Sequence, residues 1–94
     1  MSDIIEKLRE LKPILKERFG IEEFAVFGSV ARGEDREDSD VDIAVLKSKK
    51  KNYFDLLDVK YFLEDSLHKS IDIGYYDSIR PIIKRHIEKD MINV

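Results

Sequence analysis

The sequence predicts an α/β (α+β) fold, a small mixed sheet of three to four strands with helices packed on it. The first observation is a helical spacing of apolar residues in two segments, near the N-terminus and over residues 53–68. The second is alternation of apolar with other residues over 41–45 and 71–75, which is the period of a strand. The third is length, because 94 residues allow one compact domain, expected to span residues 1–94.

The N-terminal segment is expected to form a helix that Ser2 or Asp3 caps and that ends at Phe19 and Gly20. Pro13 is expected to kink or restart this helix, because proline offers no backbone N–H. The apolar positions that recur at roughly helical spacing are Ile4, Ile5, Leu8, Leu11 and Leu15.

The first half of the sheet is expected in the next segment of the chain. Residues 24–27 are apolar and predict a short buried strand that stops at a glycine and a serine. The polar stretch 30–39 predicts a short helical turn and a loop. Residues 40–45 predict the second strand, and 47–51 predict a basic, solvated turn.

A second long helix is predicted from Tyr53 to about His68. Its apolar residues spread over more than one stripe, so this helix is either buried on two sides or partly exposed for a partner. A third strand follows over 71–75. Tyr75 and Tyr76 are expected to be exposed and, with this helix, are candidate docking surfaces.

The C-terminal segment predicts a last helix and an edge strand. Asp77 or Ser78 is expected to cap the helix, which runs through His86 or Lys89. Residues 91–94 can then add a short edge strand.

Composition excludes several classes of protein. The absence of cysteine excludes disulfides, thiol nucleophiles and thiolate zinc sites, and two histidines are too few for a multi-histidine metal site. No apolar run approaches the roughly 20 residues that span a bilayer, so no membrane association and a cytoplasmic location are expected. The net charge of −3 argues against direct nucleic-acid binding.

Three carboxylates are the candidate chemical centre: Asp40, Asp42 and Asp72. Asp40 and Asp42 are two residues apart in a predicted strand, so their side chains project from one face. Asp72 lies in the third strand, opposite in phase to its apolar neighbours. If the two strands are adjacent, all three acids converge, and divalent cations relieve their mutual repulsion.

The bend before these acids predicts a phosphate site. Gly28 lets the backbone approach a ligand closely, and Ser29 offers a hydroxyl at the start of a helical turn. Arg32 and Arg36 could neutralise further phosphate charge or serve as solvated surface charges. Phosphate donors beside metal-binding carboxylates are what an enzyme acting on nucleoside triphosphates requires.

The string GSVARGEDREDSDVD resembles the signature of the polymerase-beta-like nucleotidyltransferase superfamily, in which Gly-Ser precedes Asp-x-Asp by ten residues. The whole chain resembles the minimal nucleotidyltransferase (MNT) antitoxins, the partners of HEPN-domain toxins. The resemblance implies that Gly28 and Ser29 hold the triphosphate. It implies that Asp40 and Asp42 bind metal and that Asp72 is the third catalytic and metal-binding acid.

The resemblance also implies an activity and a partner. ATP would be the substrate with Mg²⁺, two ions being expected, and an acceptor hydroxyl would attack the α-phosphorus and release pyrophosphate. The acceptor implied is a tyrosine of the HEPN ribonuclease toxin, which AMP addition silences within a possible hetero-oligomer. The short chain independently favours an acceptor that arrives on another protein.

Two alternative functions remain open at this point. One is a binding-only antitoxin that blocks its partner by contact and retains the acids as a relic. The other is a nucleotidyltransferase that acts on RNA ends, which the net charge of −3 disfavours.

Overall fold

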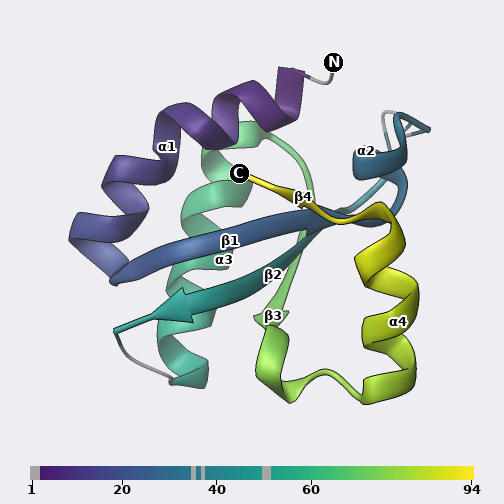
Figure 1. The fold of residues 1–94 in the computed structure, drawn as a ribbon. Helices are drawn as coiled ribbons and strands as arrows, with labels where there is room; N and C mark the ends of the chain where they lie inside the picture. Colours follow the sequence, from purple (N-terminus) through teal and green to yellow (C-terminus); the bar gives the residue numbers. More distant parts are fainter. Residues whose placement is uncertain (1–2, 35, 37, 50–51) are drawn as a thin grey trace.

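The computed structural model describes residues 3–34, 36, 38–49 and 52–94 (Figure 1). Four α-helices, one 3₁₀ turn (η1) and four strands follow one another in these residues. Their order along the chain is α1 (Asp3–Phe19), β1 (Ile21–Phe27), α2 (Gly28–Arg32), β2 (Val41–Ser48), α3 (Tyr53–Leu67), β3 (Ile71–Tyr75), η1 (Tyr76–Ser78), α4 (Pro81–Asp90) and β4 (Ile92–Asn93). None of the described helices is long and apolar enough to cross a membrane.

The four strands form one mixed sheet in the order β3-β2-β1-β4. β1 pairs antiparallel with both β2 and β4, whereas β2 and β3 run parallel with α3 as the connection between them. A parallel pair needs such a crossover, because a tight hairpin can join only antiparallel strands. The predicted mixed sheet is confirmed, and so is the edge strand near the C-terminus.

The main core lies between one face of the sheet and the helices α1 and α3. Alternate strand residues such as Phe24, Val26 and Ile43 are buried there, together with Leu8 of α1 and Leu63 of α3. In Figure 1 these two helices lie together, and α4 stands apart from them. The apolar residues that show the helical and strand periods in the sequence are therefore buried together in one core.

Leu8→Ala should lower the free energy of unfolding by about 2–5 kcal/mol, because the Leu8 side chain is fully buried and its loss leaves a cavity. Urea denaturation followed by circular dichroism measures this change. Ile14→Ala is the matched control in the same helix, since Ile14 is 37% exposed and should cost less than about 1 kcal/mol. Equal losses in the two variants would contradict this placement of the core.

The second face of the sheet carries the small residues Ala25 and Ala44, which are register partners and are 0% exposed. Two elements cover this face, because α4 contacts β1 and η1 contacts β2. Ile87 is the buried residue of α4. The row next to this alanine pair on the same face contains Asp42 and Asp72, so α4 flanks the candidate site.

Two predicted helix boundaries were wrong. Of the kink or restart expected at Pro13, the restart is wrong: α1 continues through Pro13, because an exposed proline removes one backbone donor while the apolar residues on either side of it are buried in the same core. α4 begins at Pro81 rather than after Asp77 or Ser78, which lie in η1. Proline favours the first helical position and drives the preceding residue, Arg80, into the extended backbone observed there. The suggested cap Ser2 lies outside the described residues, as do Lys50 and Lys51 of the predicted basic turn.

The expected exposure of Tyr75 and Tyr76 was also wrong, since both are half-buried. The Tyr75 hydroxyl accepts a hydrogen bond from the Asn52 backbone N–H at 2.8 Å, and the Tyr76 hydroxyl donates to Glu88. The sequence allowed the helix that begins at Tyr53 either to be buried on two sides or to be partly exposed, and the second alternative is confirmed. α3 is partly exposed, because Phe54 and Tyr61 are 72% and 62% exposed.

Candidate active site

The register of β2 against β3 brings two of the three predicted acids together. Asp42 and Asp72 are direct partners in this parallel pair, so their side chains project from the same face of strands that lie about 4.8 Å apart. Asp40 was expected within the strand but lies immediately before it, because β2 begins at Val41, whose N–H donates to the Ser70 carbonyl at 2.9 Å. Asp42 is half-buried, whereas Asp40 and Asp72 are exposed.

The electrostatics of this cluster are visible at Asp42. Partial burial raises the pKa of the Asp42 carboxyl, and the negative charges of Asp72 and then Asp40 raise it further. Arg32 acts in the opposite direction and lowers this pKa. The two neighbouring acids therefore lie close enough to repel Asp42, and its ionised form is held at a cost in free energy.

Gly28 allows the backbone to pass directly beside Asp42. Its φ of +76° lies in the left-handed region, which favours glycine. A Cβ at this position would lie 3.2 Å from the Asp42 Cγ and closer still to Oδ2. The glycine is therefore required both by backbone conformation and by the space that the carboxylate occupies.

Gly28 also begins α2, in which Ser29 is the second residue and half-buried. No side chain caps the first turn of this five-residue helix. At its other end Gly33 adopts a left-handed conformation and donates its N–H to the Val30 carbonyl, while the Glu34 N–H donates to Ser29. These bonds satisfy carbonyl groups at the C-terminal end of the short helix, so they close the helix at Gly33.

The structure separates the two arginines that the sequence singled out. Arg32 lies at the site, where its guanidinium contacts Glu34 at 3.1 Å and Asp90 at 3.2 Å. The hydrogen bonds to these carboxylates raise the pKa of Arg32. Arg36 is exposed on the loop, and its described hydrogen bonds use backbone atoms, with Ser39 and Lys69 as partners.

A cavity of about 320 Å³ opens between α2 and α4 beside this cluster. Its walls include Gly28 and Arg32 from α2, and His86 and Lys89 from α4. Sequence reasoning did not select His86 or Lys89. The available signal was their spacing of three residues, which places both on one face of a helix.

The donor set suits a hard divalent cation, because carboxylate oxygens are the protein ligands that Mg²⁺ prefers and a cation would relieve the repulsion at Asp42. Within the described residues, the acidic and histidine side chains do not form a ready-made group of three or more that could hold a metal. Mg²⁺ commonly completes its coordination with water and substrate phosphates, so a site that uses fewer protein ligands remains consistent with this chemistry.

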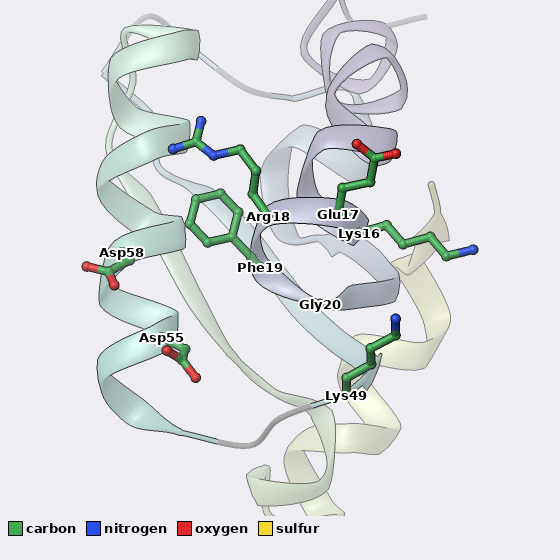
Figure 2. Close-up of a pocket in the computed structure, with 8 residues that line it drawn as sticks. All are labelled: Lys16, Glu17, Arg18, Phe19, Gly20, Lys49, Asp55 and Asp58. Carbon is green, nitrogen blue, oxygen red and sulfur yellow. The ribbon is translucent and has the colours of Figure 1, made fainter.

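A second cavity, of about 310 Å³, lies at the other end of the sheet, where β1 begins and β2 has ended (Figure 2). It is bounded by the last turn of α1, by Lys49, and by Asp55 and Asp58 of α3. Arg18 lies over the rings of Phe19 and Phe62, 5.3 and 5.2 Å from their centroids. The three candidate acids take no part in this cavity, so it is separate from the candidate site.

Comparisons with known proteins show which proteins this chain is similar to. Residues 9–94 match the family model described as "Polymerase beta, Nucleotidyltransferase". A protein of Methanocaldococcus jannaschii provisionally named as a protein adenylyltransferase is 39% identical over 92 residues, which cover 98% of each chain. The protein adenylyltransferase MntA of Thermococcus cleftensis is 33% identical over 94 residues, covering all of this chain and 95% of that one.

Solved structures share the fold. A structure described as a minimal nucleotidyltransferase is 32% identical with a TM-score of 0.77, over 99% of this chain and 97% of the other. A chain of a toxin–antitoxin complex with AMP-PNP has a TM-score of 0.78 at 19% identity, over 98% of this chain and 72% of that one. A chain from the complex of a tri-AMPylated Shewanella oneidensis HEPN toxin with an MNT antitoxin has a TM-score of 0.61 at 20% identity, over 96% and 64%. At those two identities the likeness concerns the fold alone. The family match and the close relatives together show that the chain belongs to the polymerase beta nucleotidyltransferase family.

Proposed function

We propose that this protein is a Mg²⁺-dependent adenylyltransferase that acts as an antitoxin. It transfers AMP from ATP to a tyrosine hydroxyl of a partner HEPN ribonuclease toxin and so neutralises the toxin. The observation that carries the proposal is the in-register pair Asp42 and Asp72, which lies with Asp40 beside the glycine bend at Gly28.

The comparisons support the substrate and the partner. Relatives that match nearly the full chain are named as protein adenylyltransferases. Chains of similar fold come from a toxin–antitoxin complex with an ATP analogue and from a complex with an AMPylated HEPN toxin. ATP as the nucleotide and a HEPN toxin as the acceptor protein are the choices that fit both the names and the site.

In the proposed reaction the acceptor oxygen forms a bond to the α-phosphorus while the bond to pyrophosphate breaks, and the hydroxyl proton leaves. Asp40, Asp42 and Asp72 would hold Mg²⁺, which supplies Lewis-acid stabilisation of the phosphate charge when bound. Asp72 is exposed and can accept the proton from the incoming hydroxyl. Asp40 and Asp42 would act on the phosphate through the cation that they hold, because a carboxylate in direct contact with phosphate oxygens would repel them.

The residues of the bend would bind the triphosphate. Gly28 permits close approach of the backbone, and the uncapped first turn of α2 offers N–H groups together with the Ser29 hydroxyl. Arg32 can exchange one of its two carboxylate partners for a phosphate oxygen. Arg36, exposed on the following loop, would contribute only long-range positive charge.

The test is the transfer of label from α-labelled ATP to a HEPN partner in the presence of Mg²⁺. Asp72→Asn should lower the transfer rate at least about a hundredfold, because it removes a metal ligand or proton acceptor while preserving shape. Glu10→Gln is the control, since Glu10 is an exposed acid on α1, outside the candidate docking helix, and should leave the rate unchanged. Binding to the partner should be the same in both variants.

Other results would favour other functions. Neutralisation of the partner without any label would indicate a binding-only antitoxin. Label on RNA ends and none on protein would indicate an RNA-directed transferase. Full transfer by Asp72→Asn would remove Asp72 from the site.

A further inference from the structure

Gly74 lies within β3, and the fold does not require glycine at this position. Unlike Gly20, Gly28 and Gly33, it has no positive φ, so its backbone conformation is open to any residue. Apart from its two chain neighbours, a Cβ added at Gly74 would meet no heavy atom of the described residues within 4 Å. Glycine inside a strand weakens the strand and often marks a place where a ligand approaches the backbone closely. The space beside Gly74 is therefore available to a ligand.

This space adjoins the candidate acids. Gly74 is two residues after Asp72 on the same strand, so both positions belong to the face of the sheet from which Asp42 projects. Their separation along the strand is about 6.6 Å, which is comparable with the length of a tyrosine side chain from its Cα to its hydroxyl. Gly74 is half-buried, whereas its register partner Ala44 is 0% exposed, so the accessible side of this pair is the β3 side.

The strand order indicates which reactant uses the space. The triphosphate is proposed to bind at the bend after β1, whereas Asp72 and Gly74 are on β3, at the edge of the sheet order β3-β2-β1-β4. In-line displacement places the attacking oxygen and the leaving oxygen on opposite sides of the phosphorus. If pyrophosphate leaves on the side of Gly28, the acceptor hydroxyl approaches from the side of β3. An edge strand is accessible to a side chain carried by another protein, because no further described strand pairs with β3 beyond β2.

We propose that the face of β3 beside Asp72 receives the ring of the acceptor tyrosine, and that Gly74 admits this ring because it has no side chain. The inference rests on the proposed function and adds a specificity-determining residue to it. The ring packs against the backbone at Gly74 with its hydroxyl at Asp72. A side chain at position 74 would exclude the ring and leave the nucleotide site at Gly28 free.

The experiment measures the transfer of label from α-labelled ATP to a HEPN partner at varied partner concentration, with the full chain and Mg²⁺. Gly74→Val should lower kcat/KM for the partner at least about tenfold, because the valine side chain occupies the position of the ring. Gly74→Ala adds a single methyl group and should give an intermediate loss. The affinity for ATP with Mg²⁺, measured by isothermal titration calorimetry, should be unchanged in both variants.

The stability of the Gly74 variants should not follow their activity. Valine favours a strand more than glycine does, and the added Cβ has open space. The melting temperature of Gly74→Val should therefore equal or exceed that of the wild type. This result separates a loss at the acceptor site from a loss by unfolding.

Asn93→Val is the matched control. Asn93 pairs with Ala25, Ala25 pairs with Ala44, and Ala44 pairs with Gly74, so Asn93 and Gly74 are at opposite ends of one row across the sheet. Asn93 is exposed on β4, at the edge away from Asp72. Valine at this position should change neither kcat/KM for the partner nor the affinity for ATP.

Three results would overturn the inference. They are an unchanged kcat/KM in Gly74→Val, an equal loss in Asn93→Val, and a loss of ATP affinity in Gly74→Val that accounts for its loss of transfer. The last result would assign the space to the nucleotide. If the wild type and Gly74→Val label the partner equally well, this inference fails and the proposed function stands. If the wild type binds ATP with Mg²⁺ but labels no partner, the proposed function fails and the inference fails with it.

Discussion

Gly28→Ala is expected to abolish adenylyl transfer and to destabilise the fold. The left-handed backbone at a φ of +76° costs a non-glycine residue about 1–2 kcal/mol. The new methyl group must also displace the Asp42 carboxylate, which adds about 1–3 kcal/mol. Displacing a carboxylate that is proposed to hold the catalytic cation should lower the transfer rate at least about a hundredfold. Urea denaturation and the labelled-ATP assay measure the two effects.

Gly33→Ala separates the two causes. Gly33 ends the same short helix with nearly the same φ, +73°, but a Cβ there has no neighbour within 4 Å. This variant should lose about 1–2 kcal/mol of stability and keep its transfer rate in conditions where it is folded. Equal activity losses in the two glycine variants would show that backbone strain alone, and not the contact with Asp42, disables the site.

Asp42→Asn should produce opposite changes in activity and stability. The rate of transfer should fall at least about a thousandfold, because the amide cannot replace the carboxylate in holding a cation that stabilises the phosphate by several kcal/mol. The free energy of unfolding without metal should rise at neutral pH, by up to about 1 kcal/mol. The gain is small because Asp42 is only half-buried and water screens its repulsion by Asp72 and Asp40.

The raised pKa of Asp42 determines the direction in which the stability of the folded chain changes with pH. The pKa of Asp42 is raised in the folded chain, so the folded state holds this proton more tightly than the unfolded state. The stability that protonation contributes is present below the ordinary aspartate pKa and is lost as the pH rises through the raised pKa. The difference in unfolding free energy between Asp42→Asn and wild type should therefore grow over that interval and then become constant.

Two findings would contradict this account. A variant less stable than wild type at neutral pH without metal would show that Asp42 is not under net repulsion. A difference that does not change with pH would show that its pKa is not raised. Added Mg²⁺ and ATP should reverse the order of stability, since ligand binds the wild-type folded state alone.

Local patterns in the sequence were sufficient for most of the elements. The alternation over 41–45 and 71–75 identified β2 and β3, and the apolar spacing identified α1 and α3, because these periods record which face of an element is buried. Helix ends were less predictable. α4 begins at Pro81, because the earlier candidate caps, Asp77 and Ser78, form part of η1 instead.

The sequence by itself determined which residues are candidates for the site. Gly28 with Ser29 and the pair Asp40 and Asp42 form one short motif. Its spacing can be recognised in the sequence without knowledge of the fold. Only the tertiary structure decided that β2 and β3 are parallel neighbours in the register that pairs Asp42 with Asp72. It alone brought α4 to Gly28, so that Lys89 lines the same cavity. Strand pairing and helix docking depend on contacts between residues far apart in the chain, and a periodic pattern carries no record of which distant element supplies the other half of a contact.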